Sequence, residues 1–260
     1  MRSLKDYLKL KLKKYRQEWG LCIIEGKRLC EEALTSDWTI EAAFISENFA
    51  NDAYYRTIKK LFSERKITPS ILGLSDFKNL ADTETPQGIL LVMKIPQQAG
   101  IPEKIIANAD WLLLLESVRD PGNLGTIIRT ADWFGVPLIL SSSDSVDFYN
   151  SKVIRGSMGS IFRVPCVEIQ DMKSLLSFLK KRNFTIIGTS PEARLGLDDF
   201  TGQPPFAIVL GSEAAGLSDG LSRQINSIIR INRRGDAESL NVAVAAGIIL
   251  HHFSNLMVKS

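Results

Sequence analysis

The chain has 260 residues, of which 45% are hydrophobic and 23% are charged, and its net charge is +3. These values are typical of a globular protein of about two domains, and the charge alone is too small to prove a polyanionic partner. The longest apolar stretches, such as residues 242–250, fall well short of the roughly 20 residues that span a bilayer. Three scattered cysteines argue against a disulfide framework, and the basic N-terminus lacks the apolar segment of a signal peptide, so we expect a cytoplasmic protein without a membrane segment.

The N-terminal 16 residues are strongly basic, with seven lysines and arginines against the single acid Asp6. Leu4, Leu8 and Leu12 recur every four residues, which predicts a helix with one apolar edge and basic sides. Three interpretations stay open: a solvated helix docked by its leucines, an arm that contacts phosphates, or a helix on a membrane surface. In the second interpretation the phosphate contacts are Lys13, Lys14 and Arg16.

A small α/β unit is expected in the first third of the chain. Short apolar runs bounded by turn residues predict strands at 21–24, 42–45, 70–74 and 88–93, with helices at 26–34 and 51–64. A stretch punctuated by proline and glycine follows. We place the first domain at residues 1–95 and a linker at 96–109.

Strands and helices alternate more strictly in the second domain, residues 110–260. Strands are predicted at 111–115, 137–140, 185–188, 206–210 and 227–231, and helices at 125–134, 172–182, 217–225 and 239–253. The strands are apolar on both faces with helices between them. This pattern predicts a parallel sheet covered by helices on both sides.

The first candidate site is the stretch 120–125 and the helix that follows it. Asp-Pro-Gly-Asn-Leu-Gly predicts a turn, and the helix after it places Ile127 on the side opposite Arg129. Arg129 is therefore either a functional cation or a surface residue paired with Asp132. Asn123 is either a site residue or a turn and capping residue.

Two further candidate sites lie near the C-terminus. Gly211 and Glu213 follow the strand predicted at 206–210. A glycine at this position lets backbone groups approach a flat ligand closely. Glu213 either binds a hydroxyl or a cation there or caps the helix that follows. Ser239 and Asn241 begin a predicted helix that is apolar nearly all round and is therefore expected to be buried. Its polar start would then lie at an internal boundary and offer unpaired N–H groups to a ligand. In the alternative interpretation, Ser239 only caps the helix.

Several common site signatures are absent from the sequence. It contains no Gly-x-Gly-x-x-Gly after a strand, no P-loop and no Cys-x-x-Cys. His251 and His252 are adjacent, so they face different ways on a helix and suit a shared metal poorly. We expect no metal.

Together these stretches resemble the motifs of the SpoU (TrmH) family of RNA ribose 2′-O-methyltransferases, in the SPOUT superfamily. The resembling residues are Asn123, Gly125, Arg129, Ala131, Phe134 and Gly135 in the first motif, Leu210-Gly211-Ser212-Glu213, Gly216 and Leu217 in the second, and Ser239-Leu240-Asn241-Val242 and Ala245 in the third. The stretch 157–165 is also similar to the family. In the first domain, Tyr15-Arg16, Ile24-Glu25-Gly26 and Thr85-Pro86-Gln87-Gly88 resemble its substrate-binding domain.

The resemblance implies a trefoil-knotted α/β methyltransferase domain preceded by a small substrate-binding domain. It also implies a homodimer and S-adenosylmethionine as the methyl donor. By motif, the cofactor contacts fall at Thr189, Gly211, Ile231 and Leu240.

The same resemblance assigns the chemistry to Arg129, which activates the ribose 2′-OH. Because an arginine is effectively always protonated, we expect it to clamp an RNA phosphate and orient the hydroxyl rather than act as a base. Asn123, Glu213, Ser239 and Asn241 then orient Arg129 and the ribose.

For four basic residues, two interpretations remain: each binds an RNA phosphate, or each is a solvated surface residue. These residues are Lys152, Arg155 and the pair Arg233-Arg234, which stands where family members often have an apolar stretch. Ribosomal RNA is favoured over transfer RNA as the substrate because of the two-domain layout. The alternatives are a transfer RNA methyltransferase, a non-catalytic RNA-binding protein with this fold, a base-methylating relative and, more distantly, a nicotinamide oxidoreductase.

Overall fold

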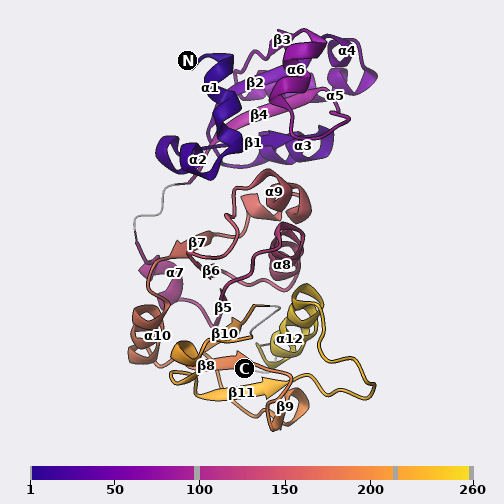
Figure 1. Ribbon diagram of the computed structural model, residues 1–260. Helices are drawn as coiled ribbons and strands as arrows, with labels where there is room; N and C mark the ends of the chain where they lie inside the picture. Colours follow the sequence, from indigo (N-terminus) through magenta and orange to yellow (C-terminus); the bar gives the residue numbers. More distant parts are fainter. Residues whose placement is uncertain (1, 97–99, 213–215, 258–260) are drawn as a thin grey trace. The chain divides into compact units, whose positions relative to one another are not determined.

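The structure, a computed structural model, describes residues 2–96, 100–212 and 216–257. The chain forms two compact units (Figure 1). Unit 1 comprises Met1–Gln97 and Asp147–Arg163, and unit 2 comprises Gln98–Val146 and Val164–Ser260. The predicted domain boundaries stay a prediction. Residues 147–163 make their contacts in unit 1, although the residues on either side of them in sequence belong to unit 2.

Unit 1 is built on a four-stranded sheet in the order β1-β4-β2-β3. The strands are β1 (Leu21–Glu25), β2 (Ile40–Ser46), β3 (Ser70–Leu72) and β4 (Ile89–Lys94). Strand β4 pairs antiparallel with β1 and β2, and β3 pairs parallel with β2. All four predicted strands are present. The third ends early because Gly73 caps the helix α6 (Leu74–Leu80), which the sequence pattern does not predict.

The basic N-terminus is not one helix, and the prediction of a single leucine edge is wrong. It forms α1 (Leu4–Leu8), a 3₁₀ turn η1 (Lys9–Lys11) and α2 (Lys13–Trp19). The chain extends at Leu12, which is 60% exposed, so the three leucines do not share a face. Leu4 and Leu8 do pack, partly buried, against a core that contains the buried residues Tyr7 and Leu10.

The remaining helices of unit 1 are α3 (Lys27–Thr35), α4 (Glu47–Ala50), α5 (Ala53–Glu64) and α9 (Ser151–Ser157), followed by the 3₁₀ turn η2 (Ser160–Phe162). Helices α3 and α5 fall at the predicted positions. Their buried residues, including Leu29 and Phe62, form amphipathic faces. Helix α9 packs on β1, far away in sequence.

A buried ion pair fixes residues 147–163 in unit 1. Both Nε and Nη2 of Arg16 lie 2.8 Å from Oδ2 of Asp147, and the two side chains are 6% and 10% exposed. Nη1 of Arg16 donates to the carbonyl oxygens of Leu10 and Lys11. Because every one of these donors is matched, the charge is tolerated in the interior.

Unit 2 contains a seven-stranded sheet in the order β7-β6-β5-β10-β8-β11-β9. The strands are β5 (Trp111–Leu115), β6 (Ile139–Ser142), β7 (Cys166–Ile169), β8 (Thr185–Thr189), β9 (Leu195–Gly196), β10 (Phe206–Leu210) and β11 (Ser227–Arg230). Every pairing is parallel, which confirms the predicted parallel sheet. The two edge strands, β7 and β9, are not predicted because they are short and the apolar pattern is weak there. The trefoil knot stays a prediction of the resemblance.

The helices of unit 2 are α7 (Glu103–Ala107), α8 (Pro121–Trp133), α10 (Met172–Lys181), α11 (Asp219–Ser222) and α12 (Val242–Met257). Helix α7 lies within the predicted linker, and its Ile106 is buried in the core of the unit. The predicted helix at 217–225 is reduced to the single turn α11. No helix in the described part of the chain is long and apolar enough to cross a membrane.

Two predicted helix starts are wrong. The stretch 120–125 is not a turn but the first turn of α8, because Oδ1 of Asp120 accepts from the backbone N–H of Asn123 (2.7 Å). Helix α12 begins at Val242 rather than Ser239. Oδ1 of Asn241 accepts from the N–H groups of Ala243 and Val244, so Asn241 caps this helix.

We predict that Arg16→Ala lowers the free energy of unfolding by about 3–5 kcal/mol, because it leaves the buried Asp147 carboxylate unpaired. Arg163→Ala is the matched control. Arg163 pairs with Glu32 at a half-exposed position, so its replacement should lower the free energy of unfolding by only about 0–1 kcal/mol. Urea denaturation measures both, and equal losses would contradict the role given to Arg16.

Candidate active site

The candidate site lies at the carboxyl ends of the parallel strands of unit 2. Leu115 at the end of β5 is in register with Leu210 at the end of β10, and Val209 of β10 is in register with Gly188 of β8. The segments that follow these strands therefore leave the sheet side by side. In open parallel sheets this edge is where ligands bind.

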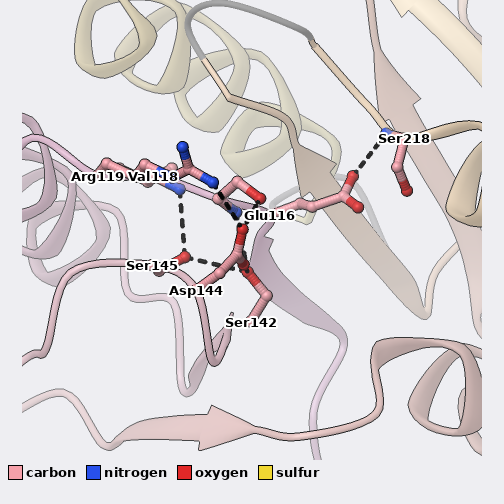
Figure 2. Close-up of polar contacts among 8 residues, drawn as sticks. Glu116, Val118, Arg119, Ser142, Asp144, Ser145 and Ser218 are labelled. Carbon is pink, nitrogen blue, oxygen red and sulfur yellow. Dashed lines mark hydrogen bonds and ion pairs between the residues drawn. The ribbon is translucent and has the colours of Figure 1, made fainter.

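Glu116 connects the first of these segments to the second (Figure 2). Its backbone N–H donates to the carbonyl of Leu210 (2.8 Å), and its Oε2 accepts from the N–H of Ser218 (2.9 Å). Glu116 as a whole is only 8% exposed. Ser218 in turn caps α11 by accepting from Leu221. Glu116 thus holds the far end of the loop after β10 against the end of β5.

The loop after β10 is closed by its own backbone. The N–H of Ser212 donates to the carbonyl of Gly216, and the N–H of Gly216 donates to the carbonyl of Ser212, both at 3.0 Å. A Cβ atom on Gly211 would lie 2.3 Å from the carbonyl carbon of Gly216, so only glycine fits there. Glu213, the predicted orienting carboxylate, lies outside the described residues.

Three of the predicted cofactor residues lie at the ends of adjacent strands. Thr189 is the last residue of β8, Gly211 directly follows β10 and Ile231 directly follows β11. Because β10, β8 and β11 are neighbours and parallel, these positions share one edge of the sheet. Leu240 lies in the exposed segment before α12. The backbone amides and carbonyls at these strand ends are therefore the groups that this edge offers to a ligand.

Two of the predicted catalytic residues touch across helices. Nδ2 of Asn241 donates to Oδ1 of Asn123 at 2.9 Å, joining the start of α12 to the first turn of α8. Arg129 is exposed on α8, six residues beyond Asn123, and the two side chains leave the helix about 120° apart. Ser239 is exposed in the segment before α12. The structure thus brings Asn123 and Asn241 together, and Arg129 faces another direction.

A serine-rich cluster after β6 supports the segment that leads into α8 (Figure 2). Oγ of Ser142 accepts from the N–H of Ser117 (2.9 Å) and donates to Asp144 (2.6 Å), and Oγ of Ser145 accepts from the N–H of Val118 (3.2 Å). Asp144 also accepts from the Ser117 hydroxyl. The backbone between β5 and α8 is therefore fixed by side chains of the neighbouring strand end.

Partial burial raises the pKa of the Asp144 carboxyl, but hydrogen bonds from Ser117 and Ser142, with a contribution from Arg119, outweigh burial. The net pKa lies below its ordinary value. Nη2 of Arg119 lies 3.4 Å from Oδ2 of Asp144, and most of the Arg119 side chain is exposed. Asp144 therefore stays ionised and orients this exposed guanidinium.

The sequence analysis missed Glu116 and the serine cluster. Glu116 directly follows a predicted buried strand, a position that could have identified it. The predicted strand at 137–140 stops before β6 ends at Ser142, so the polar run at 141–145 was not placed at the ligand-binding edge.

The predicted RNA-contacting residues differ in accessibility. Lys14 and Lys152 are exposed, whereas Lys13 and Arg155 are partly buried. Nη2 of Arg155 donates to Oδ2 of Asp82 (3.0 Å). The Arg16 guanidinium is occupied by Asp147 and backbone carbonyls, so we leave Arg16 out of the RNA-binding set. Among residues 2–96, 100–212 and 216–257, no three His, Cys, Asp or Glu side chains form a group that could hold a metal.

We predict that Asp144→Asn destabilises the protein near neutral pH and that the difference shrinks in acid. The folded-state pKa lies below the unfolded value of about 3.9, so the stabilisation is present above that pH and is lost as the pH falls through the folded pKa. Thermal unfolding of both proteins between about pH 6 and pH 3 measures the difference. A difference in stability between the two proteins that grows in acid would contradict the role given to Asp144.

Comparison with known families assigns both parts of the sequence. The SpoU rRNA methylase family matches residues 98–251, and the MRM3-like substrate binding domain matches residues 2–91. Among curated relatives, the 23S rRNA (guanosine(2553)-2′-O)-methyltransferase RlmP of Bacillus subtilis is 32% identical over 250 residues, covering 96% of this chain and 95% of that protein. A 23S rRNA (uridine(2479)-2′-O)-methyltransferase of Streptomyces viridochromogenes is 26% identical over 244 residues, covering 91% of this chain and 83% of its own.

Solved structures agree with this assignment. A putative RNA methyltransferase of the TrmH family from Porphyromonas gingivalis superposes with a TM-score of 0.79 at 28% identity, covering 97% of this chain and 98% of that one. The SpoU methyltransferase AviRb from Streptomyces viridochromogenes, in complex with AdoMet, superposes over the full length of both chains with a TM-score of 0.86; at 23% identity it supports the fold alone. The chain belongs to the SpoU rRNA methylase family.

Proposed function

We propose that this protein transfers the methyl group of S-adenosylmethionine to a ribose 2′-OH of ribosomal RNA in the cytoplasm. The observation that carries the proposal is the hydrogen bond between Asn123 and Asn241, since these residues belong to separate family motifs 118 positions apart. The relatives named as 23S rRNA 2′-O-methyltransferases support ribosomal RNA over transfer RNA.

When bound, the cofactor supplies an electrophilic methyl group on a sulfonium. Thr189, Gly211, Ile231 and Leu240 would hold it, largely through backbone groups at the ends of β8, β10 and β11. The close approach of Gly211 to Gly216 keeps that part of the edge free of side chains. With a reactive methyl donor, the task left to the protein is to place the hydroxyl in line and at contact distance.

Arg129 would bind an RNA phosphate and orient the 2′-OH. Its guanidinium stays protonated and offers a planar set of donors that matches a phosphate. Asn123 would present the first turn of α8 in a fixed orientation, because Asn241 holds its side-chain oxygen. Ser239 and Glu213 complete the proposed set around the ribose. When the 2′-oxygen takes the methyl group, the carbon–sulfur bond breaks to leave a neutral thioether, and the hydroxyl proton passes to solvent.

We predict that Arg129→Ala lowers kcat for methyl transfer by about 100-fold or more and leaves the affinity for S-adenosylmethionine nearly unchanged. Arg129→Lys keeps the charge but not the planar donors, so it should restore only a minor part of the rate. Arg182→Ala is a control, because Arg182 pairs with Glu103 on the surface of the same unit. Full activity of Arg129→Ala would remove this residue from the mechanism.

We also propose that the protein is a homodimer formed through α12 and the end of α8. These helices pack side by side (Figure 1), and the Phe134 ring lies 5.8 Å from the His251 ring. Val244 and Ile248, one helical turn apart, are 52% and 39% exposed, and Trp133 is 84% exposed. Such apolar exposure on packed helices fits burial against a second copy.

Ile248→Asp should convert the protein to a monomer, because a carboxylate on this face would be desolvated in the dimer. Sedimentation at several protein concentrations measures the change. Ile71→Asp, at a more exposed apolar position in unit 1, is the control and should leave the mass unchanged. A wild-type protein that is monomeric throughout, or an Ile248→Asp variant that still dimerises, would contradict this interface.

A further inference from the structure

The broken N-terminal helix places two aromatic rings among three cations on the surface of unit 1. Tyr15 and Trp19, one turn apart on α2, lie with ring centroids 5.0 Å apart at an angle of 48°. Both side chains are partly exposed, and Trp19 also packs against the apolar core beneath. Trp19 is therefore held by the core, and both rings are accessible from outside.

Each of the three cations lies over one or both rings. Cζ of Arg2 lies 4.4 Å from the centre of Trp19, and Nζ of Lys14 lies 5.8 Å from the centre of Tyr15. Nζ of Lys9 lies 5.7 Å from each ring. Two acids also reach this cluster: Asp6 pairs with Lys9, and Glu18 accepts from the Trp19 indole N–H. The cations outnumber the acids here, and Lys5 adds further positive charge along the same segment. Nζ of Lys11 instead donates to the backbone carbonyls of Asn79 and Ala81.

We propose that Tyr15 and Trp19 bind an unpaired RNA base by stacking, while Arg2, Lys9 and Lys14 bind the phosphates on either side of it. The inference rests on the proposed function in taking RNA as the substrate, and it adds a base-recognition site that phosphate contacts alone do not provide. Proteins that bind single-stranded RNA combine positive grooves with aromatic side chains on which bases stack.

The relative strengths of the contacts favour an exchange on binding. A cation–π contact at an exposed site is weaker than the stacking of a base on an aromatic ring. A base can therefore displace a cation from a ring face, and the released cation gains a phosphate partner instead. A tilted pair of rings accepts any base, so the site selects unpaired nucleotides rather than a particular sequence.

The break at Leu12 makes this arrangement possible. In one continuous helix, Lys9 would continue the line of α1 away from the rings. Instead the extended Leu12 backbone turns α2 back, so that residues from both segments surround the same two rings. Arg2, before α1, reaches Trp19 at the end of α2 in the same way.

The experiment is a binding titration of the full chain against single-stranded oligoadenylate of about 12 nucleotides, within the range of known single-strand sites. A strand of the same length with abasic riboses is the second probe, because it keeps the phosphates and removes the bases. Tyr15→Leu and Lys14→Ala are the test variants. Tyr55→Leu is the control, since Tyr55 packs on Phe49 in another helix of the same unit.

Stacking predicts that Tyr15→Leu binds oligoadenylate about tenfold more weakly, with an unchanged dependence of log K on log salt concentration. Lys14→Ala should instead reduce that slope by about 0.7, the value for one phosphate on a single strand. On the abasic strand, Tyr15→Leu and the wild type should bind alike. Tyr55→Leu should match the wild type on both strands.

An unchanged affinity of Tyr15→Leu for oligoadenylate, or an equal loss on the abasic strand, overturns the stacking site. Methyl transfer to ribosomal RNA by the wild type, measured separately, distinguishes the two proposals. Transfer together with unchanged Tyr15→Leu binding removes the stacking site and keeps the proposed function. A base-dependent Tyr15→Leu loss without any transfer keeps the stacking site and overturns the function.

Discussion

The parallel pairing of β5 with β10 is the constraint on which the rest of the candidate site depends. Their register places Leu115 beside Leu210, although the two strands are almost a hundred positions apart in sequence. The segments after both strands must then leave the sheet together. Glu116 links them, because its backbone N–H donates to the carbonyl of Leu210 and its carboxylate accepts from the N–H of Ser218. The packing of α12 on α8 adds the third motif through the bond between Asn241 and Asn123. Residues from three separate motifs reach one edge because the sheet is parallel, which is a property of the fold rather than of any single residue.

Much of this architecture can be predicted from the sequence, for identifiable reasons. Strands such as 111–115 and 206–210 are continuous apolar runs between turn residues, and the structure places β5 and β10 at those positions. The edge strands β7 and β9 escape prediction because they are short, with four and two residues. The N-terminal leucine repeat misleads, because periodicity does not reveal the extended backbone at Leu12, and α12 begins later than predicted because Asn241 rather than Ser239 caps it.

The site residues are predictable only in part. Asn123 and Asn241 stand out as polar residues beside helix starts, but nothing in their spacing indicates that they hydrogen-bond to each other. Glu116 acts through the backbone N–H of Ser218, and Asp144 acts through the hydroxyls of Ser117 and Ser142. Their importance therefore depends on tertiary contacts that no local pattern encodes. For Arg16, the sequence predicts a role in RNA binding that the structure does not support. Arg16 sits in a basic segment typical of phosphate binding, yet Asp147, 131 residues away, draws its guanidinium into the interior.

Unit 1 and unit 2 thus contribute different physical properties to the proposed activity: a basic and aromatic surface on one, and a backbone-lined edge with an exposed arginine on the other. The most direct test is methyl transfer from labelled S-adenosylmethionine to unmodified ribosomal RNA and transfer RNA, supplied separately and followed by nucleoside analysis. The account predicts a 2′-O-methylnucleoside from ribosomal RNA. A base-methylated nucleoside, or transfer to transfer RNA only, would contradict it.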